Sequence, residues 1–516
     1  MSVKILTYLG RPLVRRRWPL AILAIVAVGV VAGGLLFAFA GSPAVAKAPP
    51  GTTVVYNLFA TDGYVALPDG GAIYNYGFVG GRAGVPLTFA KSVTPSDPDG
   101  KTGAYGDLTY NGNGTLAAGA PTPTPGPITG TEAELAGHAQ WPAPIIYATV
   151  DDVVQIRFKN LGVNANPDAP NDPHSIHLHG LDVNAANDGV PETSIGAVPA
   201  NAVTPGAGNV IVYMFSPKNA GTYMYHCHQE ADIHVQMGMY GALVIYNKGD
   251  AAAAFGPGAN KGGKLFGWDY DKDYVLLLTE VDTRQHGAED GIFEGDYQGD
   301  AYNPVNYHPQ YWQINGLSFP NTIHVGSGSF NWTDWIAAHP GYDPFITGSV
   351  SKTHGNSANP KGDKVLLRMI NMGFETQPIH MHGFHAKVIG SDQRGWNWAN
   401  TPKWGEGYEK QTLTIGSGET YEWLLNIGQQ SVTSTYPAET QTRYDPSGLP
   451  VANTDTSKTV ITAPDGDPYI GGPTVSGANG LPMPGQLFPM HNHDDYKATN
   501  NGVYPGGMFT MIEVLP

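Results

Sequence analysis

Residues 152–162 alternate between apolar and polar side chains. Successive side chains of a strand point to opposite faces of its sheet, so this period of two predicts a half-buried β-strand. The apolar positions are Val154, Ile156 and Phe158, and the polar positions are Gln155, Arg157 and Lys159. Similar extended runs recur between clusters of Gly, Pro, Asn and Asp, which predicts an all-β protein with long loops.

The same strand pattern returns 211 residues later, over residues 363–373. Each copy is followed by a histidine cluster, and each cluster is followed further along the chain by an H-x-H motif. The four motifs are HSIHLHG at 174–180, HCH at 226–228, QPIHMHG at 377–383 and HNH at 491–493. Because these features repeat in the same order in both halves, they predict a duplicated domain.

We therefore predict two β domains, one over residues 51–262 and one over residues 263–516. The second is expected to begin where the chain enters the strand-rich stretch KLFGWDYDKDYVLLLTEVD. Residues 88–140 and 429–484 are rich in Pro, Thr, Ser and Gly, and we interpret them as insertions whose role the sequence does not indicate.

Composition agrees with the all-β prediction, since the 516 residues include 67 Gly and 42 Pro and only 14% are charged. The formal net charge is −16. A nucleic-acid partner calls for a basic patch, so this charge argues against nucleic-acid binding. An acidic, well solvated surface explains the charge.

The first 50 residues are predicted to be a signal peptide or a membrane anchor. Arg15, Arg16 and Arg17 precede an uncharged stretch from Trp18 to Ala40, which is long enough to cross a bilayer. The positive-inside rule keeps the arginines in the cytoplasm and places the rest of the chain at the periplasmic or extracellular face. The A-x-A site at residues 44–46 leaves cleavage open, and the sequence does not decide between Sec and twin-arginine export.

Cys227 is the only cysteine of the chain and lies between His226 and His228. An exported chain with one cysteine has no internal disulfide, so its thiol is free or metal-bound. In a strand, its sulfur faces away from the two flanking imidazoles. His234 and Met239 follow closely, and two histidines, one thiolate and an axial methionine form the blue-copper site, which transfers electrons.

The second histidine of such a site has to come from a neighbouring strand. His174 fits, because it precedes His177 by three residues and can face the other way if the chain bends at Ser175. Met237 competes with Met239 for the axial position, and Met239 is preferred. Zinc is the main rival metal. It favours three or four ligands at each site, and a thiolate next to eight paired histidines does not match a structural zinc site. A purely structural role would bury many imidazoles without partners, at a large cost in desolvation.

The motifs HLHG, YHCHQEADIHVQMGM, PIHMHG and MHNH resemble those of the multicopper oxidases, and the resemblance covers most of residues 140–516. It implies two cupredoxin domains, which are Greek-key β-sandwiches or barrels, and copper as the cofactor. It also implies a trinuclear centre with one type 2 copper on His177 and His380. The type 3 copper pair would be held by His179, His226, His228, His382, His491 and His493.

The second half departs from the laccase pattern of this family. Asn492 stands where the thiolate would be, and Gln377 stands where its histidine partner would be. The type 1 copper therefore belongs to the first domain alone. Two-domain multicopper oxidases and copper nitrite reductases share this placement and are typically homotrimers with an inner copper site between subunits, so the resemblance implies a homotrimer by analogy.

The function implied by the resemblance is one-electron oxidation of a small reductant at the type 1 copper. Electrons would pass through Cys227 to His226 and His228, and dioxygen would be reduced to water. Candidate reductants are phenols and related organic molecules, Mn(II), Fe(II) and Cu(I). Asp188 resembles the acidic proton-relay residue near the type 2 copper, although an Asp-Gly turn explains it almost as well.

Two alternative functions also fit part of the motif pattern. One is a copper nitrite reductase, which needs a single type 2 copper on three histidines in place of the full set of eight. The other is a copper-binding or electron-carrying cupredoxin without enzymatic activity, which leaves the eight histidines unexplained. Copper content separates the first alternative from an oxidase, and dioxygen uptake separates the second.

Overall fold

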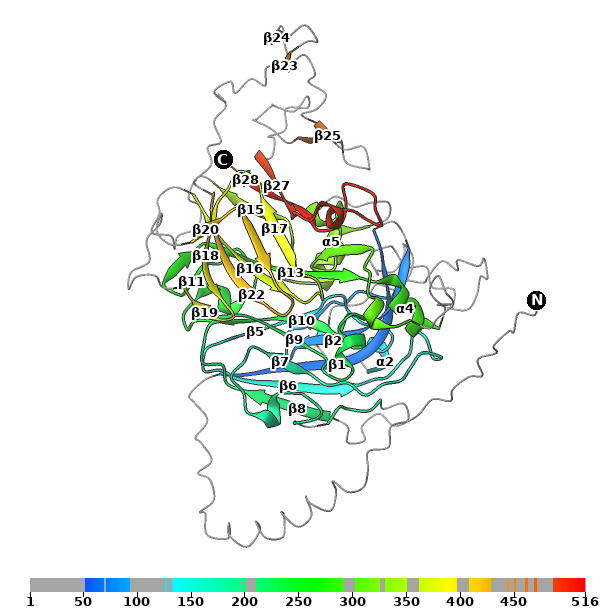
Figure 1. Ribbon diagram of the computed structural model, residues 1–516. Helices are drawn as coiled ribbons and strands as arrows, with labels where there is room; N and C mark the ends of the chain where they lie inside the picture. Colours follow the sequence, from blue (N-terminus) through cyan, green and yellow to red (C-terminus); the bar gives the residue numbers. More distant parts are fainter. Residues whose placement is uncertain are drawn as a thin grey trace, which may run out of the picture. The chain divides into compact units, whose positions relative to one another are not determined.

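The computed structural model shows a mostly β protein in which residues 49–516 form one compact unit (Figure 1). The described residues are 52–68, 71–92, 126–127, 132–194, 196–200, 210–291, 302–324, 330–349, 362–396, 408–427, 443–444, 450–451, 460–462, 468–470 and 486–515. The predicted export segment and most of both predicted insertions lie outside these ranges. Within the described ranges, no helix combines the length and the apolar composition needed to cross a membrane.

Two four-stranded sheets form the first half. The first has the order β2-β1-β6-β8, with β1 at Thr53–Ala66, β2 at Ala72–Arg82, β6 at Val153–Asn160 and β8 at Val210–Phe215. The second has the order β5-β10-β9-β7, with β5 at Ala143–Thr149, β7 at His177–His179, β9 at Gly221–His226 and β10 at Tyr240–Tyr246. One core cluster holds apolar side chains of both sheets, such as Ile156 and Leu243, so the sheets form a sandwich.

The second half repeats this arrangement with additional strands. Its larger sheet has the order β14-β13-β16-β22-β18-β19, with β13 at Lys272–Val281, β14 at Tyr311–Ile314, β16 at Lys364–Asn371, β18 at Ala386–Ser391, β19 at Arg394–Gly395 and β22 at Thr420–Asn426. Its other sheet has the order β15-β28-β27-β17-β21, with β15 at Ile346–Ser349, β17 at Gln377–Met381, β21 at Thr412–Ile415, β27 at Gln486–Asn492 and β28 at Phe509–Leu515.

Helices and short strands complete the described elements. The helices are α2 at Glu132–Leu135, α3 at Ala231–His234, α4 at Thr283–Asp290 and α5 at Trp332–Ala338. The short strands are β3 at Pro86–Leu87, β4 at Gly126–Pro127, β11 at Gly263–Leu265, β12 at Trp268–Tyr270, β20 at Glu409–Lys410, β23 at Arg443–Tyr444, β24 at Pro450–Val451, β25 at Val460–Thr462 and β26 at Pro468–Ile470. The 3₁₀ helices are η1 at Ala185–Asn187, η2 at Ala251–Ala254, η3 at Pro304–Asn306, η4 at Asn321–Ile323 and η7 at Asp495–Ala498.

Pairing directions show that the two halves share one topology. β1 runs parallel to β6 as β13 runs parallel to β16, and β5 runs parallel to β10 as β15 runs parallel to β28. The two predicted repeat strands are β6 and β16. The all-β, two-sandwich fold predicted from the sequence is confirmed, while the exact domain boundary at residues 262 and 263 stays a prediction.

One face of β6 and one face of β16 are more buried than the sequence pattern predicts. Lys159 was placed on the solvent face of β6, but only 5% of it is exposed. β16 is buried along its whole length, because its second face packs against the other half of the protein. Arg368 on that face forms an ion pair with Asp273 at 2.8 Å, so the buried charge is compensated.

Candidate metal centre

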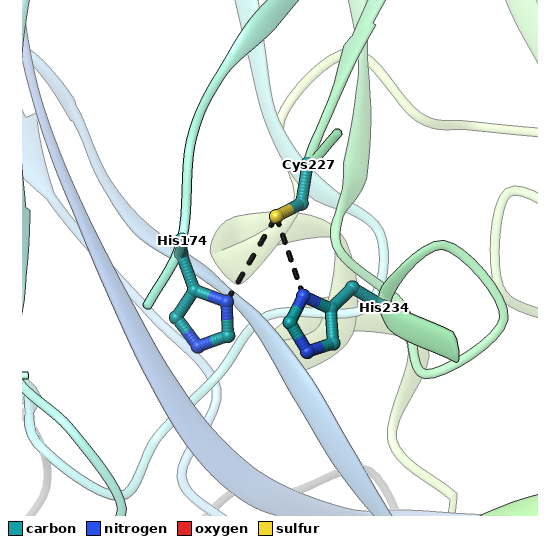
Figure 2. A group of neighbouring side chains, drawn as sticks. All are labelled: His174, Cys227 and His234. Carbon is teal, nitrogen blue, oxygen red and sulfur yellow. Dashed lines mark hydrogen bonds between the residues drawn. The ribbon is translucent and has the colours of Figure 1, made fainter. Parts of the chain in front are cut away.

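Cys227 directly follows β9, and its sulfur lies between two imidazoles (Figure 2). The Sγ atom is 3.8 Å from Nδ1 of His174 and 3.5 Å from Nδ1 of His234. The three side chains are buried, and their ligand atoms all lie within 4.8 Å of one another. One thiol and two imidazoles converge here without a disulfide partner, so they form a site for a soft or borderline metal ion.

Three local features bring these side chains together. His174 exchanges backbone hydrogen bonds with Val198 (3.0 and 2.6 Å), which holds it outside β7. The next residue, Ser175, donates its N–H to the Cys227 sulfur at 3.5 Å and accepts the N–H of His228 on its Oγ at 3.2 Å. α3 places His234 on the other side of the sulfur.

The two methionines proposed as axial ligands are both fully buried. Met239 is tied to the site through its backbone, since its carbonyl accepts the N–H of Cys227 and its own N–H donates to the carbonyl of His234, both at 3.0 Å. The carbonyl of Met237 instead accepts the N–H of Tyr76 at 3.1 Å. These backbone hydrogen bonds favour Met239 over Met237 as the axial ligand. The role of Met239 as a ligand stays a prediction.

The two imidazoles of the site have opposite electrostatic surroundings. Burial, with a contribution from His234, holds the pKa of His174 well below its usual range, so this imidazole is neutral. Burial also acts to lower the pKa of His234, but Asp172 and Cys227 outweigh it and raise this pKa to about 10. A metal ion on Nδ1 of His234 has to displace a proton, so metal binding here releases protons.

A quartet of imidazoles lies on the opposite side of the Cys227 backbone. The rings of His177 and His226 are 5.1 Å apart, and those of His177 and His228 are 5.3 Å apart. His179 joins them, with its ring 5.6 Å from that of His177. Burial lowers the pKa of His226 to about 3, which keeps its imidazole neutral as a metal ligand requires. This group is called the first quartet below.

Backbone carbonyls orient two rings of the first quartet. Nδ1 of His177 is 2.7 Å from the carbonyl oxygen of Asp188, and Nδ1 of His226 is 2.8 Å from that of Cys227. Such contacts fix the tautomer and leave Nε2 for a metal ion. The Asp188 carboxylate is also 3.4 Å from Nδ1 of His177, so the predicted relay residue does lie beside this quartet.

The second quartet consists of His380, His382, His491 and His493, which lie on and beside β17 and β27. The Nε2 atoms of His382 and His491 are 3.2 Å apart, and the rings of His380 and His493 are separated by 5.2 Å. His382 and His493 are exposed. None of the ring contacts among these eight described histidines joins the two quartets.

The second half keeps the backbone frame of the Cys227 site but not its ligands. The N–H of Asn492 donates to the carbonyl of Met508 at 2.9 Å, and the N–H of Met508 donates to that of Lys497 at 3.0 Å. The same two bonds link Cys227, Met239 and His234, so Lys497 occupies the place of His234. Sequence spacing missed this correspondence, because the loop of the second half is longer.

In the second half, hydrogen-bonded side chains occupy the place that corresponds to the Cys227 site. The amide of Asn492 donates to Oε1 of Gln377 at 2.6 Å and to the sulfur of Met508 at 3.5 Å. Gln377 in turn donates to Glu280 at 2.8 Å. The Lys497 ammonium contacts Glu375 at 3.3 Å and donates to the carbonyl of Thr376 at 2.8 Å. A hydrogen-bonded polar network therefore replaces a metal site.

Two carboxylates beside His234 were not identified from the sequence. Oδ2 of Asp172 lies 3.6 Å from Nε2 of His234, and Glu230 belongs to the same group of closely spaced ligand atoms. That Nε2 is buried and makes no hydrogen bond. The only signals in the sequence were the position of Asp172 two residues before His174 and the Gln-Glu pair after HCH.

Comparison with known proteins relates both halves of the chain to one family. The family described as multicopper oxidase matches residues 121–249 and 319–426. The copper resistance protein A of Escherichia coli is 26% identical over 327 residues, covering 59% of this chain and 48% of that protein. The copper resistance protein A of Pseudomonas syringae pv. tomato is 27% identical over 313 residues, covering 59% and 44%. The chain thus spans less than half the length of these relatives.

Among solved structures, the blue copper oxidase of Nitrosomonas europaea is 19% identical, with a TM-score of 0.46 and coverage of 90% of this chain and 86% of that one. The chain is therefore similar to the multicopper oxidases in both of its halves. Copper is the cofactor of this family. The thiol and imidazole groups of the Cys227 site, with the predicted Met239 thioether, are the donors that copper takes in blue-copper proteins.

Proposed function

We propose that this protein is a copper-dependent oxidase that takes single electrons from a small reductant at the Cys227 site and passes them to dioxygen. The observation that carries the proposal is the buried convergence of His174, Cys227 and His234 directly behind the first quartet. The backbone of residues 226–228 joins the two sites, because the Cys227 sulfur faces one and the flanking imidazoles face the other. Copper in both sites would supply the redox chemistry, in which four electrons and four protons convert dioxygen to two molecules of water.

Copper counting and gas measurements test this function. The copper-loaded protein should hold the metal of both kinds of site and should take up dioxygen when a reductant is supplied. A chain with only one type 1 and one type 2 copper, reducing nitrite in place of dioxygen, would instead support the nitrite reductase alternative. Retained copper without dioxygen uptake, with organic and metal-ion reductants alike, would support a copper carrier.

We further propose that the chain assembles as a homotrimer in which the first quartet of one subunit meets the second quartet of the next. The proposal is supported by the lack of ring contacts between the two quartets among the described residues and by the exposure of His382 and His493. A cluster of four imidazoles of which two are exposed has room for a partner, and a second copy would supply the missing half of the site. Sedimentation or light scattering of the copper-loaded protein should give the mass of three chains, and a monomer with full activity would contradict the proposal.

The group beside His234 favours a metal ion as the reductant. Asp172 and Glu230 offer carboxylate oxygens, which suit Fe(II) and Mn(II) better than Cu(I), a soft ion that prefers sulfur. Nδ1 of His234 faces Cys227 while its Nε2 faces Asp172, so an ion held by the carboxylates adjoins a ligand of the proposed copper site. The relatives are named for copper resistance, so Cu(I) is the second reductant to test.

A double variant tests the reductant. Asp172→Asn with Glu230→Gln keeps the side-chain shapes but removes both negative charges. We expect the KM for Fe(II) or Mn(II) to rise, with little change in the oxidation of an uncharged phenol. Asp182→Asn serves as a control, because Asp182 is also exposed in the first half but pairs with Arg394. An equal effect on the metal ion and the phenol would contradict a metal-ion site.

We also propose export of the mature protein, with residues 18–40 acting as signal or anchor. The support is the sequence pattern alone, since this segment lies outside the described residues. Fractionation of cells that express the full chain or a chain lacking residues 1–50 tests the proposal. The full chain should be found outside the cytoplasm, and the shortened chain should remain inside.

A further inference from the structure

A row of three tyrosines leads away from the Cys227 site. The ring of Tyr76 lies 5.9 Å from that of His174 and 5.6 Å from that of His234. Tyr74 follows at 5.5 Å from Tyr76, and Tyr64 follows at 5.3 Å from Tyr74. Tyr64 and Tyr74 are partners across β1 and β2, and Tyr74 and Tyr76 share one face of β2. Ring contacts are therefore continuous from both imidazoles to Tyr64.

Each phenol of this tyrosine row donates a hydrogen bond to a carboxylate. The pairs are Tyr76 with Glu289 at 3.2 Å, Tyr74 with Asp62 at 3.0 Å and Tyr64 with Asp290 at 2.6 Å. The Tyr76 hydroxyl is also 3.3 Å from the carbonyl oxygen of Pro170. Glu289 and Asp290 form the last turn of α4 and are half-buried, so the row begins at the proposed copper site and ends near solvent.

Three other buried tyrosines of the same sandwich donate to backbone carbonyls, whereas Tyr246 of β10 donates to the Asp273 carboxylate at 2.9 Å. Tyr56, Tyr223 and Tyr225 donate to the backbone carbonyls of Tyr147, Asn219 and Pro144 respectively. A backbone carbonyl accepts a hydrogen bond but does not take up a proton, whereas a carboxylate does both. Packing alone explains buried tyrosine rings in a sheet, but it does not explain a proton acceptor at each successive phenol.

Oxidation of a tyrosine by one electron makes its phenol strongly acidic, so the electron leaves readily only when the proton has an acceptor. Burial and the neighbouring Asp62 carboxylate raise the pKa of Tyr74 above its ordinary value, so this phenol is protonated before oxidation. Asp62 lies in hydrogen-bonding distance of that proton, and the transfer needs no movement of the backbone.

We propose that the tyrosine row carries oxidising equivalents from the copper-loaded Cys227 site to the protein surface beside Asp290. In the first step Tyr76 gives one electron to the oxidised site and its proton to Glu289, which leaves a neutral tyrosyl radical. Tyr74 then reduces that radical and gives its own proton to Asp62, while Glu289 returns its proton to Tyr76. The same exchange moves the radical to Tyr64.

Dioxygen is the oxidant for this relay, and a soluble one-electron donor such as ascorbate or a thiol is the final reductant. When the normal reductant is scarce, the tyrosine row carries oxidising equivalents away from the Cys227 site to the surface. This transfer protects the histidine and cysteine ligands from oxidation. It goes beyond the proposed function and rests on copper being bound at the Cys227 site.

Electron paramagnetic resonance of rapidly frozen samples tests the relay. Copper-loaded protein, reduced with fewer electrons than dioxygen requires, is mixed with dioxygen and frozen. The wild type should show an organic radical whose signal narrows when the protein carries ring-deuterated tyrosine. Tyr76→Phe should abolish the signal, and Glu289→Gln, which keeps a hydrogen-bond acceptor but removes the base, should weaken it. Tyr223→Phe is the matched control and should leave the signal unchanged.

A second measurement keeps the relay testable if the protein takes up no dioxygen. A photochemically generated ruthenium(III) complex oxidises the protein directly, and the tyrosyl radical should again depend on Tyr74 and Glu289. Absence of dioxygen uptake refutes the proposed function, whereas equal radical yields in the wild type, Tyr74→Phe and Glu289→Gln overturn the relay. Retained visible absorption of the copper-loaded variants shows that they are folded.

Discussion

A different group of imidazoles lies on each side of the Cys227 backbone. Its sulfur faces His174 and His234, and the adjacent His226 and His228 belong to the first quartet. This arrangement follows from the alternation of side chains in an extended segment. A single residue therefore links the Cys227 site to the first quartet.

Cys227→Ser tests that link. Serine has nearly the same shape but provides no thiolate, so we expect loss of the blue absorption and of dioxygen uptake. Copper on the histidine quartets should remain, because the quartets do not use the sulfur. Copper analysis, visible absorption and oxygen-electrode assays measure the three quantities. Unchanged turnover with an intact fold would show that electrons enter elsewhere.

Gly189 positions the first quartet through its neighbour Asp188. It has a φ of +76°, and a Cβ atom there would lie 1.8 Å from the carbonyl oxygen of Ile176. Gly189→Ala should therefore cost about 2 kcal/mol or more in unfolding free energy and reduce copper binding at His177. Gly196→Ala is the control, since it has open space around it. Urea unfolding and copper analysis compare the two variants.

At the scale of elements, the loop after β27 explains why the second half has no type 1 site. It preserves the backbone bonds of the loop after β9 but presents Lys497 where His234 stands. A positively charged ammonium repels a metal cation, and the amides of Gln377 and Asn492 satisfy each other. The second half therefore differs from the Cys227 site at three ligand positions, which are Gln377, Asn492 and Lys497.

A rebuilt site tests this correspondence. The triple variant Gln377→His, Asn492→Cys and Lys497→His should gain a second blue-copper absorption, because Met508 already holds the place of Met239. The double variant that retains Lys497 should not gain it. Copper titration followed by visible absorption measures both. Equal absorption in the two variants would show that Lys497 is not the equivalent of His234.

Glu422 of β22 joins the two sandwiches by accepting the N–H of Thr222 in β9 at 2.9 Å. Burial raises the pKa of Glu422 to about 7, above its ordinary value of 4.5. The folded protein therefore binds this proton more tightly than the unfolded chain. The stability that it contributes is present below the ordinary pKa and is lost as the pH rises towards 7.

Glu422→Gln should remove this pH dependence. Relative to the variant, the wild type should lose up to about 3 kcal/mol of unfolding free energy between acidic and neutral pH. Urea unfolding of both proteins at several pH values gives the difference directly. A constant difference across this range would show that Glu422 ionises normally in the folded state.

At the scale of the whole molecule, the proposed homotrimer makes assembly a condition of activity. A mixed oligomer tests this. One chain carries His226→Ala and His228→Ala, and the other carries His380→Ala and His382→Ala. Each alone should be inactive, but co-expression should restore part of the dioxygen uptake, because some interfaces then pair an intact first quartet with an intact second one. Continued inactivity of co-expressed, trimeric protein would contradict a shared site.

The sequence by itself determined the residue types and the strand periods. Alternation located β6, the repeat located β16 and predicted two sandwiches, and the motifs named the candidate metal ligands, because these properties depend on local order along the chain. Burial of Lys159 and of both faces of β16 was not predictable, since it depends on which surfaces pack together.

Only the tertiary structure decided which distant side chains meet. It brought Asp172 and Glu230 to His234, aligned the tyrosine row with its carboxylates, and matched Lys497 to His234 across loops of different length. Such contacts join segments that lie far apart in the chain, and their distances follow from strand order and loop path, which periodicity does not specify.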